Sequence, residues 1–249
     1  MNSVAVVIPT ADRPELLIRA VRSVLEQSRA VDQVIIVDNG LIEAEVNVSD
    51  PRVTVIRTAP RIGPGRSRNI GAFHARTDYV AFLDDDDVWH SKYLEQTILL
   101  VESRGAKVVV GKLQRLAISG AEPSDYKLFP SDPSAQRAIY YRNPGFGGQN
   151  ILLQKAFFEQ LGGFDERMPA SVDRDLAARI LQASEHIHVQ PNSIAILCDH
   201  PGVRVRESQV RGNKMFILKH WRHMTAIEIY FAVRMYIKRF VKSRYQKIV

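Results

Sequence analysis

YVAFLDDDDVW, residues 79–89, places four consecutive aspartates directly after a run that has the composition of a buried strand. Tyr79 to Leu83 is short and almost wholly apolar, which is typical of a strand covered on both faces. Adjacent carboxylates repel one another by about 1 kcal/mol per close pair in water, and by more in a partly buried cleft. The stretch therefore predicts a sheet whose strand ends at Asp84, with a compensating cation close by.

Outward from this stretch, short apolar strands alternate with helical patterns. The strands are predicted at residues 4–8, 34–37, 53–56 and 79–83, and the helices at 14–27, 66–76 and 91–104. This alternation is typical of an α/β fold with a mixed, mainly parallel sheet that helices cover on both faces. A chain of 249 residues can form one large domain, or one domain with an appendage.

Polar residues gather where the predicted strands end. Thr10 and Asp12 follow the first strand, Asp38 follows the second, and Asp84 to Asp87 follow the fourth. Ligands of parallel α/β sheets bind beyond the carboxyl ends of the strands, so these clusters are expected to share one crevice with Arg68. Carboxylates for a ribose hydroxyl and a metal, together with guanidinium groups for phosphates, indicate a nucleoside diphosphate site.

Composition limits the compartment. The single cysteine, Cys198, forms no internal disulfide, which suits a reducing cytoplasm, and it is expected to be a buried strand residue. No secretory signal is recognisable before the first strand, and no uncharged apolar stretch reaches the ~18 residues that span a bilayer. We therefore expect a cytoplasmic protein, either soluble or attached peripherally.

Positive charge is concentrated at the C-terminal end. Residues 212–249 carry nine Lys or Arg against one acid, Glu228, whereas the other 211 residues carry 25 basic and 26 acidic groups. Apolar residues at helical spacing in this tail predict a basic amphipathic helical extension. Such a helix suits an anionic membrane surface, for example the cytoplasmic face of an inner membrane, but its apolar side could equally pack on the body or in a homodimer. No nucleic-acid motif accompanies the basic residues, so no nucleic-acid partner is expected.

Four ordered segments resemble a known family. They are VVIPTADRPELLIRAVRSVLEQS, VIIVDNG, GPGRSRNIGAFHARTDYVAFLDDDDVW and GGFDERMPASVDRDLAARI, and together they span about residues 3–200. The chain thereby resembles a family 2 glycosyltransferase of the GT-A fold. The resemblance implies transfer of a sugar from a nucleotide sugar, most commonly a UDP sugar, to a hydroxyl of a saccharide or lipid-linked acceptor. It also implies inversion at the anomeric carbon, a divalent metal and a catalytic domain over residues 1–211, in which residues 1–110 bind the nucleotide and 111–211 supply the acceptor side and the base.

The resemblance assigns the nucleotide-binding residues one by one. The family's first nucleotide-binding segment matches Pro9, Thr10 and Asp12. The acid that usually contacts the nucleobase or ribose matches Asp38. The arginine expected near the base or phosphates matches Arg68. Asp84 to Asp86 match the family's DXD motif. The resemblance places Asp84 toward the ribose or metal, Asp85 on the nucleotide, and Asp86 as the foremost ligand of Mn²⁺ or Mg²⁺. Asp87 is expected to support the others or to cap the next helix.

A base must take the proton of the acceptor hydroxyl as the new bond forms. The family typically has Glu-Asp-x-Asp-Leu at this point, and this chain has Val172 to Leu176, so the resemblance makes Asp173 the catalytic base. Asp173 could instead be only a structural acid at a helix start. Asp175 is expected to anchor the start of that helix.

Two further segments complete the predicted pocket. The glycine-rich segment NPGFGGQN, residues 143–150, lies beside the acceptor and donor sugar in the resemblance, with Gln149 and Asn150 as hydroxyl partners; its glycines could equally just form a turn. His200 resembles a late histidine that approaches the metal or diphosphate, and the alternative is a surface histidine.

Three functional hypotheses stay open on the sequence alone. The first is a metal-dependent inverting glycosyltransferase of polysaccharide or glycoconjugate biosynthesis. The second is a nucleotidyltransferase acting on sugar nucleotides, although the segment ADRPELL lacks the glycine-rich basic signature expected after its first strand. The third is a non-catalytic module that binds nucleotide sugars or docks on membranes.

Overall fold

The computed structural model describes residues 2–46, 48–199 and 206–245, and it contains one mixed sheet between helices. The order across the sheet is β3-β2-β1-β4-β8-β6-β9-β5, with β7 paired to β6. The strands are β1 Val4–Thr10, β2 Gln33–Asp38, β3 Val53–Arg57, β4 Tyr79–Phe82, β5 Val88–Trp89, β6 Val108–Leu116, β7 Ser124–Lys127, β8 Ile151–Gln154 and β9 His188–Cys198. The prediction of a mixed, mainly parallel α/β sheet is confirmed.

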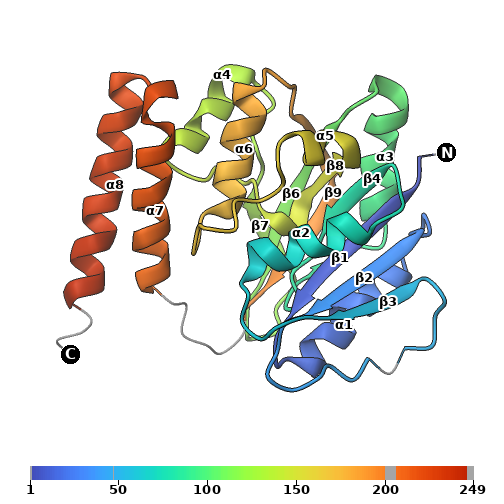
Figure 1. Ribbon diagram of the computed structural model, residues 1–249. Helices are drawn as coiled ribbons and strands as arrows, with labels where there is room; N and C mark the ends of the chain where they lie inside the picture. The colour runs from blue at the N-terminus through green and yellow to red at the C-terminus, as the bar shows by residue number, and fades with distance from the viewer. Residues whose placement is uncertain (1, 47, 200–205, 246–249) are drawn as a thin grey trace.

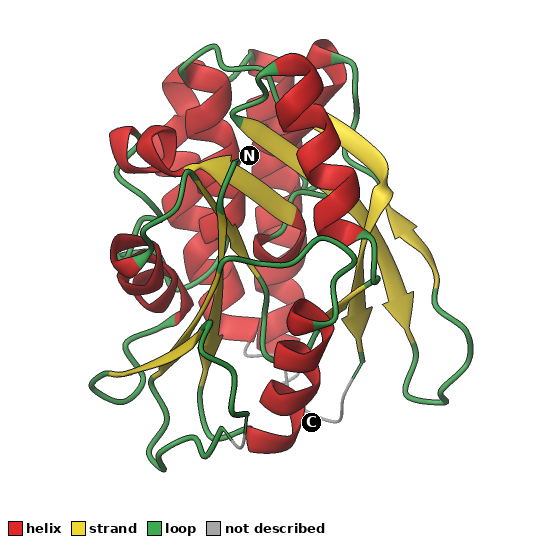
Figure 2. Ribbon diagram, turned by 90° about the vertical axis from the view of Figure 1, so that its right-hand side faces the viewer, coloured by secondary structure: helices red, strands yellow, loops and turns green. Residues whose placement is uncertain are grey.

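The N-terminal half of the sheet is parallel. Strands β3, β2, β1 and β4 run the same way, so that their carboxyl ends meet at one edge. Strand β8 is antiparallel to both β4 and β6, and β9 runs parallel to β6. The strands turn relative to one another across the sheet (Figure 2), as the right-handed twist of strands requires.

Helices cover both faces of the sheet (Figure 1). The helices are α1 Pro14–Leu25, α2 Pro64–His74, α3 Tyr93–Arg104, α4 Pro133–Gln136, α5 Lys155–Gln160, α6 Val172–Gln182, α7 Arg206–His220 and α8 Ala226–Tyr245, with 3-10 turns η1 Arg137–Tyr140, η2 Gly148–Asn150 and η3 Trp221–His223. Alternate residues of each strand enter opposite cores: Val6 packs with α1 and α3, whereas Val7 packs with α2, α5 and α6.

Helices α7 and α8 form a hairpin beside the sheet, and α8 is the outermost helix in Figure 1. Residue 212, the predicted start of the tail, lies inside α7. Phe216 of α7 is fully buried and belongs to the same core as α6, so this helix packs on the body. In the part of the chain that the structure describes, no helix combines the length and the apolar character that a membrane crossing requires.

Candidate active site

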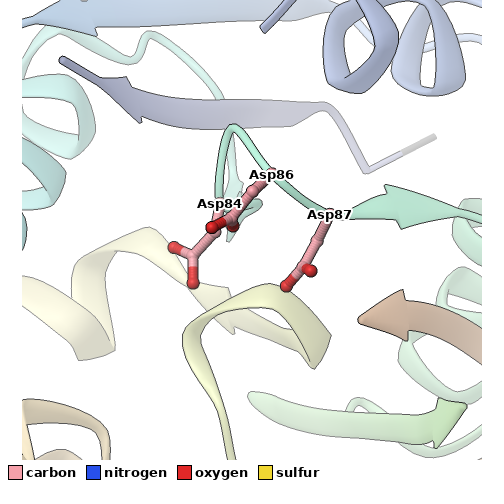
Figure 3. Close-up of side chains that lie close together, drawn as sticks. All are labelled: Asp84, Asp86 and Asp87. Carbon is pink, nitrogen blue, oxygen red and sulfur yellow. The ribbon is translucent and has the colours of Figure 1, made fainter. Parts of the chain in front are cut away.

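The four aspartates occupy the turn between β4 and β5, at the carboxyl edge of the parallel strands. Asp84, Asp86 and Asp87 lie close together on this turn (Figure 3), and one carboxylate oxygen from each lies within 4.8 Å of the other two. All three donors are hard oxygen atoms, which Mg²⁺ and Mn²⁺ prefer. Burial, followed by the charges of Asp84 and Asp86, raises the pKa of Asp87 to about 8. A divalent cation would relieve this repulsion, so the donor set fits the expected metal.

Asp85 turns away from that cluster. Its side chain is almost fully buried, Thr10 Oγ1 donates to its Oδ2 at 2.7 Å, and Arg13 lies 2.9 Å from its Oδ1. Burial raises the pKa of Asp85 to about 6, against the opposing effects of Arg13 and Thr10. Asp85 therefore joins the end of β1 to the acidic turn. The resemblance had instead implied that Asp85 contacts the nucleotide directly. Asp87, which was expected to support the others or to cap the next helix, belongs to the three-carboxylate cluster and also accepts the Cys198 N–H at 3.0 Å.

Two arginines of the α1 region neutralise the turn, and neither was among the predicted site residues. Arg13 donates to Asp86 Oδ2 at 2.8 Å in addition to its contact with Asp85. Arg19 donates to the Asp86 carbonyl at 2.7 Å. The only signal in the sequence was that Arg13 directly follows Asp12, at the end of the first predicted strand.

Arg68 connects the acidic turn to the predicted base. It lies buried on α2, a helix that begins after Gly63 in the left-handed region and has Pro64 in its first turn. Its guanidinium donates to Asp84, and the same group lies 3.7 Å from Asp173 Oδ1. Its Nε has no hydrogen-bond partner among the described residues. A single cation thus holds the two parts of the site together. The sequence predicted neither the Arg68–Asp84 pair nor the Arg68–Asp173 pair.

Asp173 lies in the first turn of α6, which follows Ser171 in the left-handed region. Its side chain is 28% exposed, so one part faces solvent while Oδ1 is buried without a hydrogen-bond partner in the described chain. Burial raises the pKa of Asp173 to about 6; Arg68 lowers it, Asp84 raises it, and the Gly148 N–H lowers it. A carboxylate with this pKa and a partly exposed side chain is suited to accept a proton near neutral pH.

The acids after β1 and β2 hold the loop at residues 40–44. Asp38 is fully buried, accepts the Gly40 N–H at 2.9 Å and the Ala44 N–H at 2.8 Å, and pairs with Arg57. Asp12 accepts the N–H groups of Leu41 and Ile42 through its Oδ1. Pro9 is buried within β1, opposite Val37 of β2. In this conformation these residues shape the loop. The resemblance had instead implied that they contact the nucleotide directly.

The glycine-rich segment lies between the sheet and the site. Asn150 is fully buried and uses both ends of its amide, accepting from Gly147 N–H at 2.8 Å and donating to the carbonyls of Gly111 and Gly145. It therefore fixes the loop in this conformation. Gln149 is buried, and its carbonyl accepts the Trp89 indole N–H at 2.8 Å. His200, the remaining predicted ligand, lies outside the described residues.

Comparison with known proteins identifies a family for this chain. The Glycosyl transferase family 2 model matches residues 5–162. The Succinoglycan biosynthesis protein ExoO of Rhizobium meliloti is 26% identical over 76% of this chain, and the match spans 59% of that protein. The Putative colanic acid biosynthesis glycosyl transferase WcaA of Escherichia coli is 27% identical over 87% of this chain and 81% of that protein.

A solved structure shares the fold. The structure of S. aureus TarS 1-349, in complex with UDP-GlcNAc, superposes with a TM-score of 0.68 over 96% of this chain and 71% of that chain, at 15% identity. The mixed sheet with flanking helices is thus the GT-A-like fold that the sequence predicted. Because the family model covers more than half of its length, the chain belongs to glycosyl transferase family 2.

Proposed function

We propose that the protein is a metal-dependent, inverting glycosyltransferase that moves a sugar from a UDP sugar to a hydroxyl of a saccharide or lipid-linked acceptor. The observation that carries the proposal is the Arg68 bridge, because this one buried cation pairs with Asp84 of the acidic turn and with Asp173 of α6. A divalent-metal cluster and a candidate base, 89 residues apart in sequence, therefore face the same space. The relatives in polysaccharide biosynthesis support a glycosyl acceptor.

The residues divide into those for the leaving diphosphate and those for the acceptor. Asp84, Asp86 and Asp87 would hold Mn²⁺ or Mg²⁺, and such a metal would supply Lewis-acid stabilisation of the charge that develops on the diphosphate. Arg68 adds a positive charge at the same place. Pro9, Thr10 and Asp85 fix the end of β1, and Asp12 and Asp38 hold the loop on which the nucleobase would lie. We retain Gln149 and Asn150 as residues that shape the sugar pocket, and His200 as a further candidate ligand.

Asp173 is the proposed base. It removes the proton from the acceptor hydroxyl, which then attacks the anomeric carbon while the bond to the diphosphate breaks. Its side chain is partly open to solvent and lies 3.7 Å from Arg68 Nη1, whereas Asp84 of the acidic turn pairs with Nη2 of the same guanidinium. A raised pKa makes the carboxylate a stronger base than an exposed aspartate, because a base is most effective with a pKa near the working pH.

The test is donor turnover by the intact chain with Mn²⁺, with Asp173→Asn as the variant. We expect the wild type to release UDP from a UDP sugar, EDTA to abolish release, and Asp173→Asn to lower transfer about 10² to 10⁴-fold. Asp50→Asn is the matched control, because Asp50 pairs with nearby Arg52 at 2.7 Å and precedes the amino end of β3, whereas the site lies at the carboxyl ends of the parallel strands. Equal turnover by wild type and Asp173→Asn would exclude Asp173 as the base.

The UDP part of the proposal rests on the TarS complex, which was solved with UDP-GlcNAc. A thermal-shift screen of UDP-, dTDP- and GDP-sugars with and without Mn²⁺ tests it, since a ligand that binds only the native state raises Tm with the logarithm of its concentration over Kd. We expect the largest metal-dependent shift with a UDP sugar. A larger shift with a dTDP sugar would reassign the nucleotide.

We also propose that α8 binds the anionic surface of a membrane, on the cytoplasmic side. Its outer face, opposite the buried Ala232, exposes Ile227, Tyr230, Ile237 and Val241 at spacings of three to seven residues. The same helix exposes five cations: Arg234, Lys238, Arg239, Lys242 and Arg244. An apolar stripe with interleaved cations favours the headgroup region of an anionic bilayer.

Charge distinguishes the membrane from a second copy of the chain. The one acid between residues 212 and 244, Glu228, is buried and paired with Arg137 at 2.7 Å, so the outer face of α8 is purely cationic. Two such faces would repel each other. A cavity of about 290 Å³ between α7 and α8 is suited to a phosphate headgroup. It is lined by Glu207, Val210, Arg211, Lys214, Tyr236, Phe240, Ser243 and Arg244.

Vesicle flotation tests this surface. We expect binding to phosphatidylglycerol vesicles, little binding to phosphatidylcholine, and loss of binding at high salt, because surface charges are screened within about 8 Å at physiological ionic strength. Ile237→Glu should weaken binding at least tenfold, since it places an acid in the acyl boundary. Ile118→Glu, at another exposed isoleucine, in the connection between β6 and β7, is the control. A dimer by light scattering without vesicle binding would assign the face to a second subunit.

A further inference from the structure

Helix α7 lies directly against the segment that leads into the candidate base. A Cβ atom at Gly212 would lie only 2.5 Å from the carbonyl oxygen of Ala170, a distance that real Cβ atoms do not adopt. Ala170 is followed by Ser171, the left-handed residue from which α6 begins. The backbone of α7 is therefore in contact with the backbone that sets the path of the chain into Asp173.

The same helix holds the residue directly after Asp173. Arg174 is buried, its Nη1 donates to Asn213 Oδ1 at 2.9 Å, and its guanidinium carbon lies 3.9 Å from the centre of the Phe216 ring. The remaining nitrogens of Arg174 donate to the carbonyls of Ile139 and Tyr140. Every hydrogen-bonding nitrogen of this cation is thus engaged, and α7 supplies both a polar and an aromatic contact.

Asp175, two residues after Asp173, is held more tightly still. Its side chain is fully buried; Lys219 lies 2.6 Å and His220 Nε2 lies 2.8 Å from Oδ1, and Arg179 donates to Oδ2 at 2.8 Å. Gln182 donates to His220 Nδ1 at 2.9 Å, so the other ring nitrogen carries the proton and donates to Asp175. This buried carboxylate therefore depends on two consecutive residues at the end of α7.

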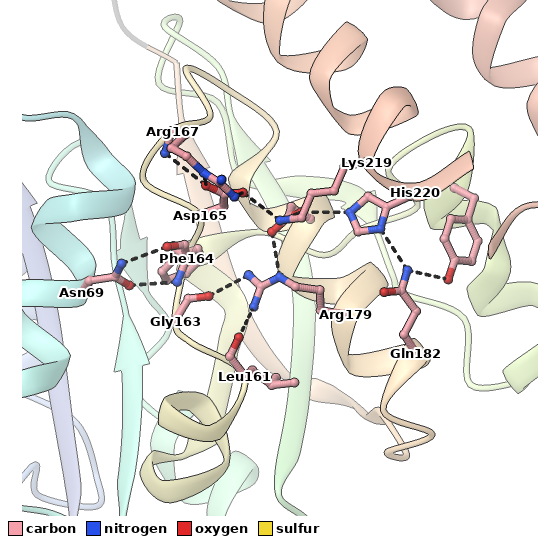
Figure 4. Close-up of polar contacts among 12 residues, drawn as sticks. Asn69, Leu161, Gly163, Phe164, Asp165, Arg167, Arg179, Gln182, Lys219 and His220 are labelled. Atoms are coloured by element: carbon pink, nitrogen blue, oxygen red, sulfur yellow. Dashed lines mark hydrogen bonds and ion pairs between the residues drawn. The ribbon is translucent and has the colours of Figure 1, made fainter. Parts of the chain in front are cut away.

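The network continues from Asp175 to the other side of the site (Figure 4). Arg179 donates to the carbonyls of Leu161 and Gly163, and Lys219 also contacts Asp165 at 2.8 Å. Asn69 holds the segment between Gly163 and Asp165 by exchanging two hydrogen bonds with the backbone of Phe164. Asn69 directly follows Arg68, the residue that bridges the two parts of the site.

The start of α6 is not held by a side-chain cap of its own. Ser171 stands at the N-cap with no side-chain hydrogen bond to the helix, although a capping side chain commonly stabilises this position. We propose that α7 is part of the catalytic apparatus, and that Asn213, Lys219 and His220 are positioning residues that hold Asp173 in place through Arg174 and Asp175. The proposal rests on the proposed function for the role of Asp173 as the base.

The first test is the kinetics of His220→Ala with the best substrate among UDP-glucose, UDP-galactose and UDP-N-acetylglucosamine, in Mn²⁺. We expect kcat to fall about tenfold or more while the donor KM changes less than about twofold, because the donor site is retained and only the base is displaced. His220→Gln should restore most of kcat, since its amide can donate to Asp175 and accept from Gln182. Gly212→Ala should reproduce the loss by pushing on Ala170 from a different point.

Glu228→Gln is the matched control, because it loosens the same hairpin without removing a partner of Arg174 or Asp175. Glu228 pairs with Arg137 through two hydrogen bonds of 2.9 and 2.7 Å, and Arg174 and Asp175 keep their contacts to α7 in this variant. We expect this variant to lower Tm and to leave kcat unchanged. An equal loss of kcat in Glu228→Gln and His220→Ala would overturn the proposal, since α7 would then act only through general stability.

Hydrogen exchange gives a readout that does not need turnover. The Asp175 N–H donates to the Ser171 carbonyl at 3.0 Å in the first turn of α6. In His220→Ala, we expect amides of residues 171–176 to exchange at least tenfold faster than in the wild type or in Glu228→Gln. Unchanged exchange would overturn the positioning role. Faster exchange in a protein that turns over no UDP sugar would instead overturn the proposed function and leave the structural connection intact.

Discussion

At the scale of single residues, the site depends on the balance of charge around Arg68. Two carboxylates, Asp84 and Asp173, share this one buried cation, and the contact to Asp84 is a direct hydrogen bond whereas Asp173 stays 3.7 Å away. The looser pairing leaves Asp173 only partly compensated. Burial therefore dominates over the attraction of Arg68, and the pKa of Asp173 rises to about 6.

This pKa predicts the acid limb of the pH profile. Asp173 must be deprotonated to accept a proton, so kcat/KM should fall about tenfold per pH unit below about pH 6 and level off above it. The same raised pKa also affects stability. The folded protein binds this proton more tightly than the unfolded chain does, so Asp173 adds to the free energy of unfolding at low pH, and this contribution is lost as the pH rises through about 6. Circular dichroism at each pH serves as the control. A flat profile down to pH 5 in a folded protein would contradict the assignment.

The sequence identified the acidic turn but not the directions of its side chains. The apolar run before Asp84 was sufficient to predict a buried strand, and the family resemblance marked the aspartates as a site. Asp85 faces the interior, whereas the other three aspartates form the three-carboxylate cluster. These directions depend on contacts with Thr10, Arg13 and the Cys198 N–H, which lie 72 to 111 residues away from their partners in sequence. A local pattern contains no information on such contacts.

At the scale of elements, the site requires that α2 lie close to the sheet, because α2 brings Arg68 to the end of β4. Close packing is achieved at Gly71, where an added Cβ would lie 2.3 Å from Val7 Cγ1 and 3.2 Å from Val37 Cγ2. Strands β1 and β2 therefore contact the helix backbone itself. A small residue at this position is a steric requirement, since interiors are packed as densely as organic crystals.

Gly71→Ala should consequently move α2 away from the sheet. We expect a loss of about 1–3 kcal/mol in the free energy of unfolding, measured by urea denaturation, as for other overpacked cores. Phe73→Ala, on the solvent side of the same helix, is the control; its side chain is 78% exposed and its removal should change stability by no more than about 0.5 kcal/mol. Equal urea midpoints for Gly71→Ala and the wild type would show that the helix can shift without cost.

The elements differ in how well the sequence predicted them. Strands β1, β2 and β3 and helices α1, α2 and α3 lie within a few residues of their expected bounds, because each has a continuous apolar run or an amphipathic period. The insertion of β8 between β4 and β6, antiparallel to both, was not predicted. Strand pairing is decided by the whole chain, and the local period of β8 is compatible with either direction.

At the scale of the whole molecule, we propose that the boundary between body and tail lies between α7 and α8. Helix α7 contributes the buried Phe216 to the core of α6 and supplies partners for two buried charges, Arg174 and Asp175. Helix α8 presents an exposed outer face, and its inner side contacts the rest of the protein through the buried Ala232 and the Arg137–Glu228 pair. The charge count pointed to residue 212 because basic residues begin there, but charge composition does not report which helix is packed.

Two truncations distinguish a structural α7 from a dispensable one. A chain that ends at residue 205 would leave Asp175 without Lys219 and His220, and removing a partner of a buried charge costs about 3–5 kcal/mol. That loss, added to an exposed core at Phe216, is comparable with the total stability of about 5–15 kcal/mol of an ordinary domain, so we expect no cooperative unfolding transition. A chain that ends at residue 225 keeps α7 and loses only the half-exposed Arg137 pair and the packing under α8, so it should unfold cooperatively at a reduced Tm. Differential scanning calorimetry measures both chains, and a cooperative transition in the shorter one would show that the body folds without α7.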